Sequence, residues 1–365
     1  MSPNSEQQAP MAQRKVSTER MPSELIAALA LVKRACATAN RQLDLLSPEL
    51  AEAIDQATQQ VLAGHCDPQL HLTVWQAASG KPTHQHMNDV LAQLASENLL
   101  KNRGTDKQVQ ADAHVNLGQS SSDIFSTAIH VAASVGIAHN LLPALAGLRA
   151  ELMTKSELSR DNANPALSQE LSGHLAQLAQ AHDAIKAALP LVCELAITGA
   201  LTSTDDRLAL AFGEHVADAL AKALALPFVS TPEKFTALTS LETLVSLHGT
   251  LKSAALSLMK ISSDMRSLTP SSDNPTHCDA LTMVCCQVMG NDVALTVGAA
   301  TGQFEGHALK PLIAHNVLQS IRLLTDATTL FTDHFARGAA LNRERAPNGL
   351  ASSLMLVTSR IPQMA

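Results

Sequence analysis

A stripe of leucine and alanine residues between positions 236 and 266 limits the choice of fold more than any other part of this sequence. Six apolar residues recur there at steps of three and four: Leu241, Leu244, Leu247, Leu251, Ala254 and Leu258. In an α-helix this spacing places all six side chains on one face. A helix of this length buries such a face against other helices, often those of another subunit. The stripe therefore predicts a bundle of long helices.

Other segments also have the marks of helices. Ser47 is expected to cap a helix that has Pro48 at its first position, and Gly64 stands where that helix should end. Longer helices are expected over about 120–155, 279–300 and 309–333. Polar connections interrupt the pattern at 159–167, 198–207 and 267–275. No alternating pattern is long enough to predict a sheet.

Composition agrees with a helical fold. Aromatic residues make up 2% of the chain, with one Trp (Trp75) and no Tyr, while hydrophobic residues reach 46% and charged residues 16%. Sheets normally draw on aromatic and β-branched residues, whereas Ala and Leu favour helices. The fold class expected is all-α, in a soluble protein whose surface is partly buried again in an oligomer.

Charge and cysteine patterns argue against several other classes of protein. The net charge is −7 and no basic stripe with interleaved aromatic residues is present, so nucleic acid is not an expected partner. No uninterrupted apolar run approaches ~20 residues, so no membrane span is expected. Residues 1–15 are polar, as in a disordered tail, and lack a secretory core. The six cysteines have no Cys-x-x-Cys spacing, which favours reduced, buried thiols in a cytoplasmic protein over zinc or disulfides.

Five blocks carry a resemblance to a known family. They are VWQAASGKPTHQHMNDVLAQLASE (74–97), HVNLGQSSSDIFSTAIHVAA (114–133), NPTHCDALTMVCCQVMGNDV (274–293), LKPLIAHNVLQSIRLLTDA (309–327) and LNRERAPNGLASSLMLVT (341–358). In this order they resemble class II fumarase, within the fumarase/aspartase/argininosuccinate lyase superfamily. The resemblance covers nearly the whole chain.

The resemblance implies an all-α, fumarase/aspartase-like long-helix bundle with a smaller N-terminal helical region. It divides the chain into the tail at 1–15, an N-terminal helical domain at 16–112 and a central bundle domain at 113–365, with the family's small C-terminal domain absent. It also implies a homotetramer, no metal or organic cofactor, and a C4 dicarboxylate ligand. The family reaction is the reversible hydration of fumarate to malate, a step of the tricarboxylic acid cycle.

Some of the family's site positions are retained. The resemblance assigns substrate binding to Ser79, Lys81, Ser120, Ser121, Ser122 and Asn274, with Lys81 in place of a threonine and Ser122 in place of an asparagine. Asp279 replaces the glutamate that orients the family's catalytic histidine. A dianion bound near Ser120–Ser122 would be favoured by a helix N-terminus, although plain N-capping by Ser121 or Ser122 is an equal alternative.

Other site positions have no counterpart. The family's Thr-His segment is replaced by DNANPA (161–166), and its Ser-Ser-x-Met-Pro-x-Lys loop by TPSSD (269–273), so the base serine, lysine and histidine are unmatched. Ser271 and Ser272 are weak substitutes because nothing near them in sequence supplies a cation, and Lys81 is more typical of a solvated surface residue.

The histidines offer no clear replacement for these groups. His84 and His86 lack a third ligand for a metal site, so a polar loop is the simpler interpretation of this pair. His174, His248 and His315 fall within helical stretches, where a structural role is the simpler interpretation.

Three functions remain open from the sequence. The first is a fumarase-type lyase, and the second is a non-catalytic paralogue that assembles with itself or with an intact fumarase. The third is a lyase of the same superfamily with another substrate.

Overall fold

A computed structural model describes residues 17–64, 70, 72–75, 80–104, 108–161, 165–197, 206–268, 276–301 and 308–336. Nearly all of them are helical, which confirms the all-α prediction. Two two-residue strands, β1 (Glu194–Leu195) and β2 (Val229–Ser230), pair in parallel and were not expected. The expected tail at 1–15 lies outside the described residues.

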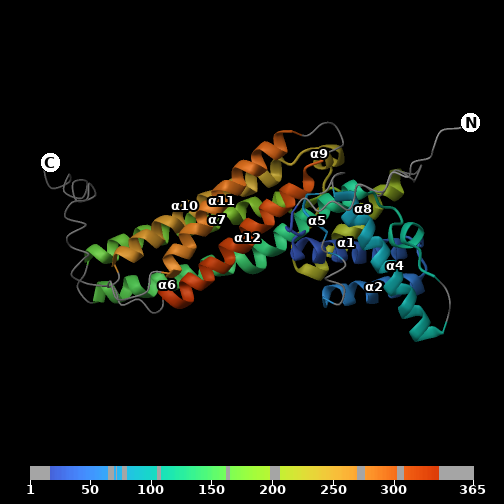
Figure 1. Cartoon of the computed structure of the whole chain (residues 1–365), viewed down its shortest axis with the longest axis horizontal. Coiled ribbons are helices and arrows are strands. Elements are labelled where there is room, and N and C mark those ends of the chain that lie inside the picture. The colour runs from blue at the N-terminus through green and yellow to red at the C-terminus, as the bar shows by residue number, and fades with distance from the viewer. Residues whose placement is uncertain are drawn as a thin grey trace, which may run out of the picture.

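The helices form a long bundle with a smaller group of helices at one end (Figure 1). The bundle contains α5 (Ser121–Gly136), α6 (Leu142–Asp161), α7 (Pro165–Val192), α10 (Glu242–Leu268), α11 (Thr276–Ala300) and α12 (Lys310–Phe331). The smaller group contains α1 (Ser23–Gln42), α2 (Pro48–Leu62), α4 (Lys81–Arg103) and α8 (Asp206–Leu224). Short α9 (Lys234–Thr239) and three π-helical turns, η3 (Ala111–Val115), η4 (Ile137–Leu141) and η5 (Thr332–Ala336), complete the described elements. Helix α8 packs on α1, so the smaller group includes residues beyond the expected domain boundary at 112. The division of the chain into domains stays a prediction.

The apolar stripe is the core of the bundle, as predicted. Leu241 is 5% exposed, and the other five stripe residues are fully buried where α10 packs on α7 and α11. The start of α2 is also confirmed: Ser47 Oγ accepts a hydrogen bond from the Leu50 amide at 3.4 Å, and Pro48 is the first helical residue. Gly64 follows the end of this helix with φ of 81°, a conformation that favours glycine.

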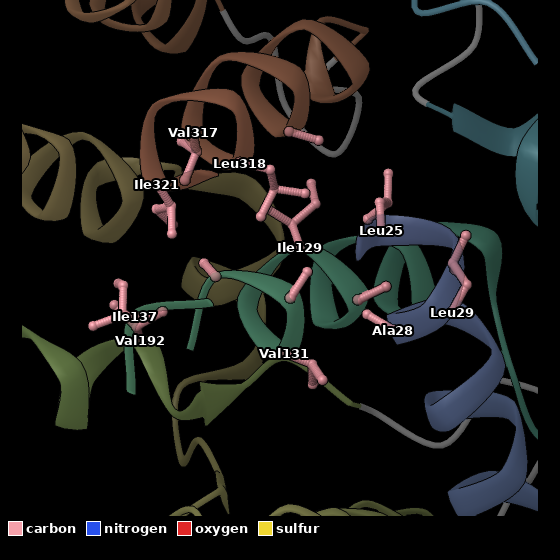
Figure 2. Close-up of a cluster of buried hydrophobic side chains, with 14 of the residues drawn as sticks. Leu25, Ala28, Leu29, Ile129, Val131, Ile137, Val192, Val317, Leu318 and Ile321 are labelled. Carbon is pink, nitrogen blue, oxygen red and sulfur yellow. The ribbon is translucent and has the colours of Figure 1, made fainter. Parts of the chain in front are cut away.

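The helix expected over 120–155 is α5 and α6 joined by η4, a π-helical turn. Figure 2 shows apolar side chains of α1, α5 and α12 meeting in one cluster, including Leu25, Ile129 and Leu318. A Cβ atom on Gly136 would lie 3.0 Å from Ile321 Cγ2, so α5 and α12 are in close contact. This packing fixes the start of α5 relative to the start of α12.

Two described helices are long and apolar enough, by length and composition, to cross a membrane, although none was expected. They span Ser121–Ser159 and Thr276–Ala300, and 44% and 33% of their most apolar windows are buried. Core helices of soluble proteins pass the same test. No membrane span was expected because the sequence has no uninterrupted apolar run of sufficient length. These two windows contain polar residues and are apolar only on average.

Candidate carboxylate-binding site

The N-terminus of α5 is held by a capping box. Ser120 Oγ accepts from the Asp123 amide at 3.2 Å, and Asp123 Oδ1 accepts from the Ser120 amide at 3.0 Å. The N-cap is therefore Ser120, which corrects the expectation that Ser121 or Ser122 caps this helix. Ser121 is half-buried and takes no part in the box, whereas the Asp123 amide donates to Ser120 Oγ and the Ile124 amide donates to Asp123 Oδ1 at 2.7 Å. A helix N-terminus favours an anion beside it.

A buried lysine lies at the same helix start. Lys310, the first residue of α12, is fully buried and donates from Nζ to Ser122 Oγ at 3.1 Å. Burial lowers the pKa of Lys310 from 10.5 to about 8, while the Asp123 carboxylate acts in the opposite direction. At neutral pH the ammonium is therefore mostly charged, and it adds a cation to the serine pair.

A second buried lysine supports the turn that precedes α5. Lys33 of α1 donates to Gln119 Oε1 at 2.7 Å and to Asn116 Oδ1 at 3.1 Å, and its Nζ lies 2.9 Å from His84 Nε2. These contacts join α1, α4 and the turn that leads into Ser120. Burial lowers the pKa of Lys33 to about 7, and burial with the neighbouring Lys33 lowers the pKa of His84 to about 3.

Of the other predicted binding residues, the structure describes Lys81. Lys81 is exposed at the first position of α4, which agrees with a surface lysine. Ser79, Asn274, Ser271 and Ser272 lie outside the described residues.

Asp279 lies near the start of α11, and this end of α11 is at the opposite end of the bundle from the start of α5 (Figure 1). Its carboxylate pairs with Arg266 of α10, and both side chains are about half exposed. Helix α11 has 25 residues, which corresponds to about 37 Å at 1.5 Å per residue. A single chain therefore holds the serine end and the Asp279 end of the family site far apart.

A serine, histidine and aspartate also meet in the bundle core. His248 Nε2 lies 2.8 Å from Ser320 Oγ, and His248 Nδ1 lies 3.1 Å from Asp292 Oδ1. This order of contacts matches a catalytic triad, which is recognised by geometry. However, His248 and Ser320 have no exposed surface, so no substrate reaches the serine. The structural interpretation of His248 holds.

The remaining sequence expectations are partly met. Of the described cysteines, Cys36, Cys193, Cys278 and Cys285 are buried free thiols, whereas Cys286 is exposed. His84 and His86 lie in α4, and His84 is buried beside Lys33, so the predicted polar loop at this pair is wrong.

Two lysines that matter most here were missed by the sequence analysis. One feature of the sequence could have indicated that Lys310 is buried. It precedes Pro311 at the first position of an apolar helix, most of which was expected to pack in the bundle. Lys33 had a similar signal, since it lies among buried apolar residues of α1. Neither signal identifies the partner, because Lys310 and Ser122 are 188 residues apart.

Comparisons with known proteins identify related sequences. A family model described as Lyase matches residues 3–272. Fumarate hydratase class II of Chromobacterium violaceum is 45% identical over 98% of this chain and 85% of its own length. The Bordetella parapertussis protein of the same name is 43% identical over 96% and 82%.

Solved structures agree with the sequence comparisons. The class II fumarase of Schistosoma mansoni superposes with a TM-score of 0.84, at 33% identity, over 94% of this chain and 82% of that one. The chain belongs to the class II fumarate hydratase family of lyases.

Proposed function

We propose that this protein binds a C4 dicarboxylate at the N-terminus of α5 and acts as a fumarase-type lyase of low turnover. The observation that carries the proposal is Lys310, a buried cation that contacts Ser122 in the first turn of α5. Fumarate and malate are dianions, and an ammonium, hydroxyls and helix amides together suit one carboxylate.

The proton-transfer groups are the weaker part of the site. Removing a proton next to a carboxylate requires a base, an acid for the departing hydroxyl, and donors around the carboxylate that gains charge. The chain retains donors at Ser121, Ser122 and Lys310, but the family's base serine, lysine and histidine have no aligned residues. Binding without efficient turnover follows.

Assembly supports the same proposal, because one chain keeps the two ends of the family site apart. One face of α11 is packed in the bundle, and the opposite face carries a second stripe that is exposed: Met283, Cys286, Gly290, Val293 and Val297. A helix that is apolar on both faces is normally covered on both. We propose that copies of this chain cover the second stripe and so bring Ser120–Ser122 of one copy near the Asp279 end of another.

Light scattering should therefore show an oligomer at micromolar concentration. The double substitution Val293→Glu and Val297→Glu is expected to reduce it to smaller species, because two charges would be buried without partners. The matched control is Leu100→Glu on α4, an isolated residue that is 53% exposed. A well-folded monomer of the unaltered chain would remove this proposal.

Ligand binding tests the function directly. Fumarate, malate or citrate should raise the melting temperature, since a ligand at ten times its Kd stabilises by about 1.4 kcal/mol. Ser121→Ala should abolish the shift, whereas Ser253→Ala, at an exposed position on α10, should leave it unchanged. The absence of a shift at millimolar ligand would leave only the capping role for this helix start.

A non-catalytic paralogue is the second candidate. It is favoured by the retention of the bundle helices together with the loss of the Thr-His and Ser-Ser-x-Met-Pro-x-Lys segments. This protein would assemble with itself or with an intact fumarase, and it would hydrate no fumarate even when a dicarboxylate is bound. Activity and thermal shift measured on one sample separate the two candidates.

A further inference from the structure

Three potential metal ligands converge at the other end of the bundle from Lys310. Glu170 and His174 lie four residues apart on α7, so their side chains share one face, and Asp264 comes from the facing turn of α10. One ligand atom from each residue lies within 4.8 Å of the other two. No metal was expected from the sequence, and Asp264 joins Glu170 and His174 only in the fold.

The imidazole of His174 has an unusual environment. Its side chain is 3% exposed, and no hydrogen bond to Nε2 is found among the residues that the structure describes. Nε2 lies 3.5 Å from Asp264 Oδ2. Bond lengths of about 2.0–2.2 Å to a tetrahedral metal separate two ligand atoms by roughly 3.3–3.6 Å, so this spacing suits a shared ion.

The charges of the cluster also suit a cation. Glu170 and Asp264 are partly exposed carboxylates. One imidazole and two carboxylates are typical of Zn²⁺, Co²⁺ or Mn²⁺, whereas Mg²⁺ and Ca²⁺ favour oxygen ligands alone. Lys260, which pairs with Asp264, is the one cation seen at this carboxylate among the described residues.

We propose that Glu170, His174 and Asp264 bind a divalent transition metal that links α7 to α10. In the sequence, the cluster lies close to both segments where the chain departs from its family: DNANPA precedes Glu170, and TPSSD follows Asp264. A metal bound to the folded chain stabilises it by mass action. Water fills the remaining coordination positions.

Isothermal titration of the metal-free full chain with Zn²⁺, and absorption spectra with Co²⁺, test this site. The chain should bind one ion tightly and melt at a higher temperature with it. Asp264→Asn and His174→Ala should each weaken that binding by roughly 100-fold or more, since even residues behind the ligands contribute 10–100-fold. Lys260→Met should tighten it, because the ammonium no longer competes for the Asp264 carboxylate.

His182→Ala is the matched control, because His182 lies two turns further along α7, is partly exposed and pairs with Asp183. It should bind the ion like the unaltered chain. Equal binding by the unaltered chain, His174→Ala and Asp264→Asn would assign the metal to surface histidines or thiols and overturn the proposal, as would no binding at all. Asp264→Asn keeps the shape of the side chain, so the test stands even if His174→Ala fails to fold.

Discussion

Purified protein is expected to hydrate fumarate at least ~10³-fold more slowly than a typical enzyme that turns over at ~10 s⁻¹. The family's base serine, lysine and histidine are unmatched together, and loss of one such group typically costs ~10² to 10⁴ in rate. Rate losses from groups that act together do not add, so we expect a reduction near the lower end of the range that the three separate losses would give. The loss of absorbance from the conjugated double bond of fumarate measures the rate.

Lys310 does not restore the missing chemistry. It contacts the binding serines and is mostly protonated at neutral pH, so it stabilises a carboxylate and is a poor base there. Ser121→Ala should abolish any residual rate together with binding. Ordinary turnover that survives Lys81→Ala and Ser272→Ala would falsify the expectation and would show that the proton-transfer groups had been rebuilt elsewhere.

The helices could be predicted because their signal is local. Steps of three and four residues decide which face of a helix is apolar, and the stripe from Leu241 to Leu258 is buried as this spacing requires. Helix ends are less certain by one or two residues. For this reason the sequence allowed Ser121 or Ser122 as the cap of α5, whereas the capping box shows that it is Ser120.

The site was less predictable because its contacts join distant parts of the chain. The resemblance identified Ser120–Ser122 and offered Lys81 as a further binding residue, although a surface position was the preferred interpretation of Lys81, and it is exposed. The buried cation is Lys310, supplied by a helix that starts 188 residues after Ser122. The pairing of Asp279 with Arg266 likewise depends on how α10 and α11 pack. The spacing of residues along one helix does not predict which residues of another helix they contact.

Lys33 should make the free energy of unfolding rise with pH. Its pKa falls from 10.5 to about 7 because the folded chain buries it completely. Between these two values the unfolded chain binds more protons than the folded chain, so raising the pH favours folding. At about 1.4 kcal/mol per pKa unit, Lys33 should contribute about 2 kcal/mol between pH 7 and 9.

That pH interval separates the lysines from other groups. The buried histidines, including His84 with a pKa of about 3, change the free energy of unfolding mainly below about pH 6.5, where the unfolded imidazoles become protonated. Burial raises the pKa of Cys36 and Cys285 from 9.0 to about 12, so above pH 9 the unfolded thiols ionise first and stability falls. Lys310, with a pKa of about 8, acts in the same direction as Lys33. A variant is therefore needed to isolate the contribution of Lys33.

Urea unfolding at pH 7, 8 and 9, at one protein concentration, makes the comparison. Lys33→Met keeps the length of the side chain and removes the titrating group, so its increase in stability from pH 7 to 9 should be smaller by about 2 kcal/mol. Lys222→Met, at an exposed position in the last turn of α8, should show the same increase as the unaltered chain. Equal pH dependence in all three proteins would mean that Lys33 stays protonated when folded. The ammonium would then be held by Gln119 and Asn116 more strongly than burial opposes it.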